Sequence, residues 1–291
     1  MCRLYGFMAN EETKVECTLV HSQNALLMQS ESDYLGRAHA DGWGLAFYHD
    51  EFPELERRAN PAYEDLHFSS TAERVYAEAV VAHVRLATVG TPSELNCHPF
   101  VFGKWAFAHN GTVSAFTQLK QELEDETDPV LQSSRVGETD SEQLFFWLLS
   151  RMRIAGLDLS RCSSADNVAE VVASSLRELA SRCRKAGAIE AKLNILLTNG
   201  QMMIATRWNN DLFTVLREGI HDCEICGIPH VHHDDSHEYR AVVIASEKLS
   251  EEPWAEVPNY SVVAIDKSII VDMKDISEVA ARVVDRCHTQ S

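Results

Sequence analysis

Short apolar runs of the kind that form β-strands occupy both ends of this 291-residue chain, and helical patterns occupy its middle. Beyond about residue 190, a series of such runs is separated by turn residues, and a last helix is predicted near Ile276 to Cys287. Two helices are predicted in the middle, one over LFFWLLSRM behind a capping pattern at Thr139 to Glu142 and one from about Ala165 to Ala186. Two strand-rich halves therefore flank a helical middle, an order of elements that agrees with an α+β fold.

The N-terminal half carries further strand signals between loops. Residues 1 to 8 predict a first strand, and LAFY after the HADGWG loop predicts another, followed by a charged connection from His49 to Asp65. A helix from Thr71 to Ala79 is predicted to lead into the apolar run AVVAHVRL. Because no linker rich in Pro, Gly or Ser divides the chain, we expect a single domain over residues 1–291. A division near residues 155 to 190 is the alternative.

The charge balance excludes several classes of partner. Lys and Arg total 26 against 44 Asp and Glu, which gives a formal net charge of -18. Such a chain repels polyanions, so we expect no nucleic acid and no anionic membrane as a partner. A signal peptide and a long apolar segment are both absent from the sequence, and the eight cysteines are irregularly spaced. These features predict a cytoplasmic protein with reduced thiols.

Cys2 has the clearest chemical meaning, because removal of Met1 would leave a thiol and a free α-amino group on the same residue. The ordinary pKa is about 8.5 for the thiol and about 7.7 to 8.0 for the amine, so both exchange protons near neutral pH. Cys2 would then be a nucleophile with its own base. Taken alone, the Met-Cys dipeptide fits equally a small residue at the start of a strand.

Further motifs follow Cys2 in order: RLATVG from Arg85, NCHP from Asn96, HNG from His109 and GETDSE from Gly137. Together with Cys2 they resemble the class II glutamine amidotransferases over about the first half of the chain. The segments HADGWGLAFY and YRAVVIASEKLSEEPWAEVPN resemble stand-alone members, such as γ-glutamyl hydrolases of ergothioneine synthesis and glutathione-degrading subunits of fungi.

The resemblance implies an N-terminal nucleophile hydrolase fold, an αββα four-layer sandwich with two sheets packed face to face between helical layers. It also implies hydrolysis of a γ-glutamyl amide bond by Cys2 through a γ-glutamyl thioester, with release of glutamate. The expected partner is a small-molecule γ-glutamyl substrate, and no cofactor is required for catalysis. The catalytic motifs lie within residues 2–142, and a strand-rich part begins at about 190.

Attack on a carboxamide places negative charge on its oxygen, and Asn110 with Gly111 offers suitable donors. An Asn side-chain amide and a glycine backbone N–H make an oxyanion hole. The same Asn-Gly pair is also a common tight turn. We therefore predict catalytic roles for Cys2, Asn110 and Gly111.

The far end of a glutamyl substrate carries a carboxylate and an ammonium. A guanidinium matches a carboxylate with two parallel hydrogen bonds, which suits Arg85, and the Asp140 carboxylate accepts from an ammonium. The resemblance implies this division of roles and adds Thr88 as a hydroxyl contact. The alternatives are a solvated strand-end charge for Arg85 and a helix cap for Asp140.

Leu86 and Val89 stand where synthase-type members usually have Trp and His. Aliphatic residues at substrate-covering positions would tolerate a larger or less polar γ-substituent, although different core packing would also explain them. This departure suggests a γ-glutamyl peptide or conjugate as substrate rather than free glutamine.

A CxxC sequence followed by histidines lies in the C-terminal part, and its candidate metal ligands are Cys223, Cys226, His230 and His232. Thiolate and imidazole together suit tetrahedral zinc, so a structural Zn site is one interpretation. Such ligands usually come as two separated pairs, and a mobile reduced loop is the other interpretation.

Two other functions fit this sequence. The chain could be a glutaminase subunit that delivers ammonia to a separate synthase, which would require a partner enzyme subunit. It could also be a noncatalytic regulator that binds metal through Cys223 and Cys226, in which case substitution of Cys2 would change nothing. We expect structural roles for His83, His98 and His109, because an amine base makes a histidine base unnecessary.

Overall fold

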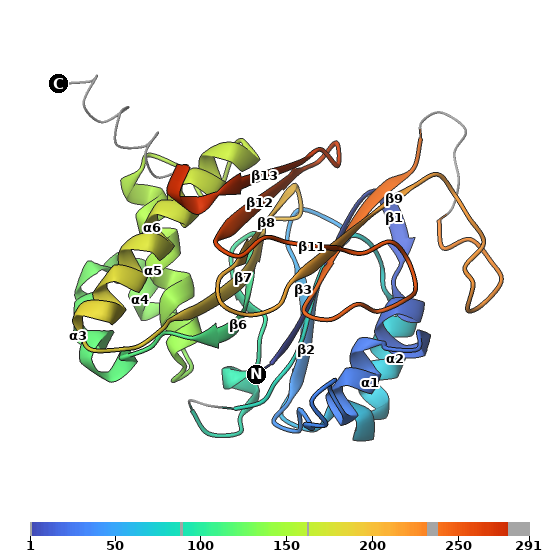
Figure 1. Ribbon diagram of the computed structural model, residues 1–291, viewed down its shortest axis with the longest axis horizontal. Helices are drawn as coiled ribbons and strands as arrows, with labels where there is room; N and C mark the ends of the chain where they lie inside the picture. Colours follow the sequence, from blue (N-terminus) through green and yellow to red (C-terminus); the bar gives the residue numbers. More distant parts are fainter. Residues whose placement is uncertain (1, 88–89, 162, 232–237, 279–291) are drawn as a thin grey trace.

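Two antiparallel sheets lie face to face in the middle of the molecule, and helices cover the outer side of each (Figure 1). The computed structural model describes residues 2–87, 90–161, 163–231 and 238–278. The layers follow the order helix, sheet, sheet, helix, which confirms the predicted αββα sandwich. Among the described residues, no helix is long and apolar enough to cross a membrane.

The first sheet combines strands from both ends of the chain. It has seven strands in the order β11-β9-β10-β1-β4-β2-β3, so that β1 lies between β10 and β4 and is antiparallel to both. Helices α1 and α2 cover its outer side (Figure 1). The bounds are β1 (Arg3–Lys14), η1 (Cys17–His21), α1 (Leu26–Glu31), β2 (Trp43–Tyr48), β3 (Glu54–Arg58), η2 (Ala62–Glu64), α2 (Leu66–Arg74), β4 (Tyr76–Val84), β9 (Phe213–Glu218), β10 (Arg240–Ala245) and β11 (Ala255–Glu256).

The second sheet also joins the two halves, because β6 pairs with β7. It has six strands in the order β13-β12-β8-β7-β6-β5, and α3 to α6 cover its outer side (Figure 1). The bounds are η3 (Glu94–Asn96), β5 (Phe100–Phe102), β6 (Trp105–Thr112), α3 (Phe116–Glu126), α4 (Pro129–Ser133), α5 (Asp140–Ile154), α6 (Ala165–Lys185), β7 (Lys192–Thr198), β8 (Met202–Arg207), β12 (Ser261–Asp266) and β13 (Val271–Asp275). Both sheets therefore mix strands from the two halves of the chain.

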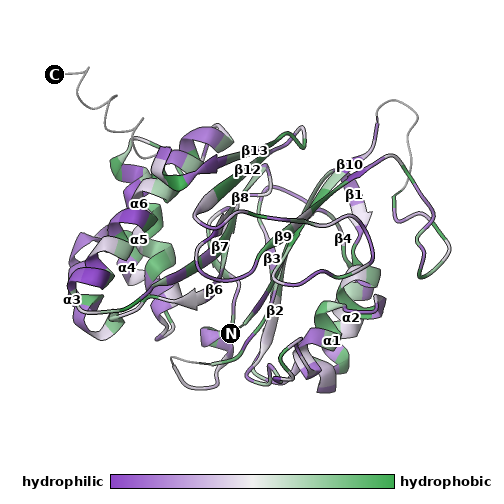
Figure 2. Ribbon diagram, in the orientation of Figure 1, coloured by the Kyte–Doolittle hydropathy of each residue, from purple (hydrophilic) through white to green (hydrophobic). Residues whose placement is uncertain are grey.

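Alternating side chains of the central strands pack into separate apolar layers on the two faces of each sheet. Along β1, Tyr5 and Phe7 pack toward α1 and α2, whereas Leu4 and Met8 pack between the two sheets. Successive side chains of a strand point to opposite faces, so a strand buried on both faces is apolar at nearly every position. Figure 2 shows this as hydrophobic colour along the central strands, with hydrophilic residues on the outer turns of the helices.

Two boundaries predicted from the sequence are wrong. The connection from His49 to Asp65 contains strand β3, which pairs with β2 and is the edge strand of the sheet among the described residues, where a charged strand is tolerated. The predicted helix from Thr71 to Ala79 begins earlier, after the Asp65 cap, and gives way to β4 at Tyr76. The helix predicted near Ile276 to Cys287 lies almost wholly outside the described residues.

Candidate active site

Cys2 lies directly before β1, at the end of the strand where it approaches the end of β4. Its Sγ lies 3.4 Å from both the backbone N and the backbone O of Leu86. Burial raises the pKa of the Cys2 thiol, while the Leu86 amide and the positive charges of Arg85 and Arg3 act in the opposite direction. The sulfur is therefore held against the RLATVG segment, and its burial favours the protonated thiol.

Arg3 contacts the backbone of Cys2, and the sequence motifs gave Arg3 no role. Its guanidinium donates to the backbone O of Cys2 at 3.1 Å and forms buried ion pairs with Asp33 at 2.7 Å and Glu247 at 2.5 Å. Asp33 and Glu247 lie far apart in the chain, and the structure brings them together as the two ion-pair partners of Arg3. Asp33 lies in the SESDYLG segment and Glu247 lies in RAVVIASEK, and no local sequence pattern connects these two segments.

Arg85 is buried where the end of β4 meets the HADGWG loop. Its backbone N donates to Gly42 O at 2.7 Å, and its guanidinium lies 3.4–3.5 Å from the backbone oxygens of Asp41, Gly90 and Thr91. The Asp41 carboxylate accepts from the Ala87 amide at 2.7 Å. HADGWG thus supports the RLATVG segment beside Cys2, and Thr88 lies outside the described residues.

Asn110 lies near the end of β6, and a side-chain contact brings it close to the start of β1. Its Nδ2 donates to Ser246 Oγ at 3.2 Å, and the same hydroxyl accepts from the Leu4 backbone N at 2.9 Å. Gly111 pairs with Leu193 in β7, where a Cβ would lie only 1.9 Å from Lys192 O. A side chain at position 111 would therefore separate β6 from β7.

Asp140 is the first residue of α5, and Thr139 caps this helix by accepting from the Glu142 amide at 3.1 Å. The capping pattern predicted from the sequence is confirmed. The Asp140 carboxylate is buried and accepts from the Val113 amide at 2.7 Å, just after the end of β6. It therefore lies beside the strand that carries Asn110.

Asn96 links two of the sequence motifs. Its Nδ2 donates to Thr91 O at 3.0 Å, and its Oδ1 accepts from the Glu138 amide at 2.9 Å. The RLATVG and GETDSE segments are held at a fixed separation by this one side chain. NCHP is recognisable in the sequence as a motif, but the role of Asn96 in positioning the RLATVG and GETDSE segments is visible only from these contacts.

The histidines of the motifs are packed inside the protein. His83 and His98 have ring centroids 4.2 Å apart, and burial holds the pKa of both well below the usual value. His109 contacts Ser141 Oγ at 2.9 Å and donates from Nε2 to Lys192 O at 2.9 Å. These contacts agree with the structural roles expected from the sequence.

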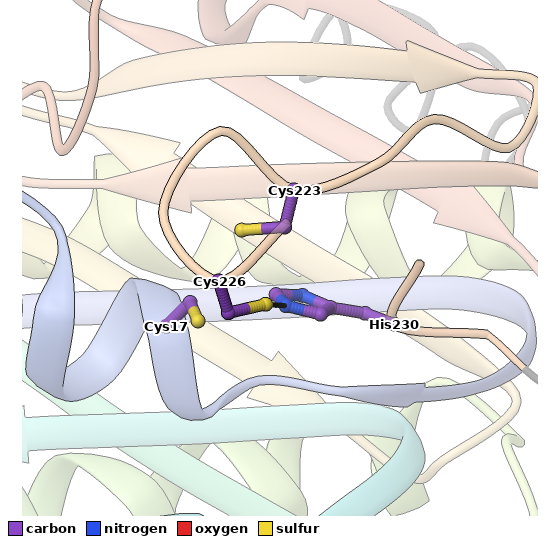
Figure 3. Close-up of side chains that lie close together, drawn as sticks. All are labelled: Cys17, Cys223, Cys226 and His230. Carbon is purple, nitrogen blue, oxygen red and sulfur yellow. Dashed lines mark hydrogen bonds between the residues drawn. The ribbon is translucent and has the colours of Figure 1, made fainter. Parts of the chain in front are cut away.

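The structure gathers most of the predicted site residues at the adjoining ends of β1, β4 and β6. Cys2 contacts the residue after Arg85, Asn110 is joined to the start of β1 through Ser246, and Asp140 contacts the end of β6. The candidate metal ligands lie elsewhere. Cys223, Cys226 and His230 gather with Cys17, which the sequence analysis did not include, and His232 lies outside the described residues (Figure 3).

Curated relatives match this chain over most of its length. It is 27% identical to the probable glutamine amidotransferase DUG3 of Saccharomyces cerevisiae, over 93% of this chain and 83% of that protein. It is 29% identical to a γ-glutamyl-hercynylcysteine sulfoxide hydrolase of Mycobacterium tuberculosis, over 91% of this chain and 93% of that protein.

Solved structures show the same fold. A predicted glutamine amidotransferase from Pseudomonas aeruginosa aligns with a TM-score of 0.59 at 23% identity, covering 94% of this chain and 100% of that one. A glutamine aminotransferase class-II domain protein from Silicibacter pomeroyi aligns with a TM-score of 0.58 at 21% identity, covering 94% of this chain and 99% of that one. The family profile described as "Glutamine amidotransferases class-II" matches residues 1–287. The chain belongs to the class II glutamine amidotransferases.

Proposed function

We propose that this protein hydrolyses the amide bond of a small γ-glutamyl substrate, with Cys2 as the nucleophile. The position of Cys2 supports this most directly, because its sulfur lies against the backbone of Leu86 at the meeting point of the predicted site residues. Membership of the class II glutamine amidotransferases and similarity to a hydrolase of γ-glutamyl compounds support the same reaction.

In the proposed reaction, Met1 has been removed and the α-amine of Cys2 accepts the thiol proton. The sulfur attacks the γ-carbonyl carbon, and the amine passes the proton to the leaving nitrogen as the C–N bond breaks. A γ-glutamyl thioester remains on Cys2. Water then attacks the thioester, which releases glutamate and restores the thiol. These steps use only groups of the protein and water, so they need no cofactor.

Asn110 and Gly111 are proposed to stabilise the oxyanion in both steps. Asn110 Nδ2 carries two hydrogens, and the hydrogen bond to Ser246 uses one of them. The second hydrogen is available to the substrate. Gly111 supplies a backbone amide at a position where a side chain would collide with β7.

Arg85, Thr88 and Asp140 are proposed to bind the amino-acid end of the glutamyl group. The buried guanidinium of Arg85 is one residue away from the Leu86 backbone that contacts Cys2. Asp140 offers a buried carboxylate from the start of α5. A cation and an anion on different elements suit the opposite charges of an α-carboxylate and an α-ammonium.

For the leaving group we propose an amine larger than ammonia. The aliphatic side chain of Leu86 follows Arg85, at a place where synthase-type members usually carry Trp. A steady-state comparison of glutamine with γ-glutamyl dipeptides tests this choice. A higher kcat/KM for dipeptides is expected, and a clear preference for glutamine would contradict it.

Release of glutamate from a set of γ-glutamyl compounds tests the reaction itself. Cys2→Ala is expected to abolish turnover, whereas Cys183→Ala, which changes a buried thiol in α6, is the matched control and should keep it. Mass spectrometry of active protein should show a chain that begins at Cys2. Turnover by Cys2→Ala, or Met1 still present on active protein, would overturn the proposal.

The relatives described as glutamine amidotransferases favour a second candidate, a glutaminase subunit that passes ammonia to a separate synthase. This function predicts that glutamine is the preferred substrate and that its hydrolysis accelerates when the partner subunit is added.

A further inference from the structure

Three cysteines and one histidine from two distant parts of the chain meet on the outer side of the first sheet (Figure 3). Cys17 is the first residue of η1, which follows β1, and it is buried. Cys223, Cys226 and His230 lie in the connection between β9 and β10. One ligand atom from each of the four side chains lies within 4.8 Å of all the others.

The CxxC segment folds as a tight turn that directs both thiols to the same side. The Gly227 amide donates to Cys223 O at 2.8 Å, and the Cys223 amide donates to Ile228 O at 3.1 Å. The Ile225 amide donates to Cys223 Sγ at 3.4 Å, which fixes the position of this sulfur within the turn. Gly227 has φ of +73°, a conformation that glycine adopts readily, so its place directly after Cys226 is required by the turn.

Backbone contacts hold this turn against the end of β1. The Lys14 amide donates to His230 O at 2.9 Å, and Thr13 pairs with Val231 in an isolated bridge. His230 is therefore held against Lys14, which lies three residues before Cys17 in the chain. Its Nε2 already lies 3.2 Å from Cys226 Sγ.

We propose that Cys17, Cys223, Cys226 and His230 bind one Zn²⁺ ion as a structural site. Three thiolates and one imidazole form a recognised tetrahedral zinc set and leave no open coordination position. A Zn–S distance of about 2.3 Å in this geometry places ligand atoms about 3.8 Å apart. Small rotations of the side chains achieve this from the separations in the structure. The close spacing suits a single ion and not a cluster of several metal atoms.

The site is too far from Cys2 to take part in the reaction. The two ends of β1, Arg3 and Lys14, pair with Val84 and Tyr76 of β4, and these eight steps at about 3.3 Å per residue span about 26 Å. The ion would instead join the connection between β9 and β10 to the segment that follows β1. Its loss should lower the thermal stability of the protein without requiring any change in the chemistry at Cys2.

Metal analysis of the full-length protein, purified with a reductant and without chelator, tests the site. Wild type is expected to hold about one zinc ion per chain and little iron. Cys17→Ser and Cys223→Ser should each reduce the zinc content about tenfold or more. Cys183→Ser changes a buried thiol outside the cluster and should keep the wild-type content, as should His232→Asn, because Cys17 completes the ligand set.

A second measurement on wild type does not depend on whether the variants fold. Cobalt added to the metal-free protein should produce the visible bands of a tetrahedral ion and a thiolate charge-transfer band, and zinc should remove both. Zinc should also raise the melting temperature of the metal-free protein. Wild type that neither contains zinc nor binds cobalt tetrahedrally would overturn the proposal, and so would Cys17→Ser with the full zinc content. A disulfide among these cysteines would leave wild type without zinc and unable to bind cobalt, and it would therefore overturn the proposal as well.

Discussion

The Asn110 side chain of the proposed site is positioned by a contact with a residue that lies far away in the sequence. Asn110 is oriented by the Ser246 hydroxyl, which also accepts from the Leu4 amide, so the proposed oxyanion donor is positioned relative to β1, the strand that follows the proposed nucleophile Cys2. The Oδ1 of Asn110 is buried and has no hydrogen-bond partner among the described residues. This amide is therefore oriented through its nitrogen.

Replacement of Asn110 by Ala tests the oxyanion role. We expect kcat to fall about 100- to 1,000-fold, because one preorganised donor is lost while substrate binding elsewhere is retained. Asn167→Ala, on the exposed side of α6, is the matched control and should leave kcat unchanged. Steady-state kinetics on folded protein decides the matter, and an unchanged kcat for Asn110→Ala would remove this residue from the mechanism.

Arg85→Lys tests recognition of the substrate carboxylate. Lysine keeps the positive charge but loses the planar fork, so we expect KM to rise about tenfold or more with a smaller effect on kcat. The same change at the exposed Arg161 should alter neither constant. If Arg85→Lys had the wild-type KM, the bidentate contact would be ruled out.

At the scale of whole elements, a helix cap lies directly beside one residue of the proposed site, Asp140. Thr139 caps α5 and Ser164 caps α6, each with its side chain accepting from a backbone amide of the first turn. Only the first of these helices carries a proposed substrate ligand, Asp140. Comparing a variant of each cap therefore distinguishes an effect on stability, expected for both, from an effect on substrate binding, expected only for the cap of α5.

Thr139→Ala and Ser164→Ala should each lower the free energy of unfolding by about 1 kcal/mol. Only Thr139→Ala is expected to raise KM, by about three- to tenfold, because the start of α5 becomes less well ordered and Asp140 with it. Chemical denaturation together with steady-state kinetics measures both effects. Equal KM values for the two variants would show that Asp140 does not depend on its cap.

At the scale of the whole molecule, buried neutral histidines link stability to pH. Burial and the positive charge of Arg3 lower the pKa of His39 to about 4, although Asp33 acts in the opposite direction. Burial also holds the pKa of His83 and His98 well below the usual value. Since the unfolded chain protonates these rings at about pH 6.5 and the folded chain does not, their contribution is complete above that pH and is lost as the pH falls.

Urea denaturation at pH 7 and pH 5 tests this linkage. For His39 alone the free energy of unfolding should fall by about 2 kcal/mol between the two values, and His83 and His98 should add to the fall. His39→Gln should therefore lose less stability on acidification than wild type. His49→Gln, which changes a more accessible ring, should behave as wild type. The same pH dependence in wild type and His39→Gln would contradict the assignment.

Local signals in the sequence were enough to predict the strand that follows Cys2 and the cap of α5. Each of these depends on neighbours within a few positions, so its pattern is visible in the chain itself. The layers of the fold came from the family resemblance, which the structure confirms. Strand β3 was missed because its charged residues are acceptable only at a sheet edge, and an edge exists only in the assembled sheet.

The remaining features depend on contacts between distant parts of the chain. Arg3 receives its partners from Asp33 and Glu247, and Ser246 joins β1 to Asn110. Cys17 joins the CxxC turn only because β1 and the connection after β9 lie side by side. Sheet pairing creates these neighbours, and the pairing itself follows from burial of apolar faces over the whole molecule, for which no short sequence pattern exists.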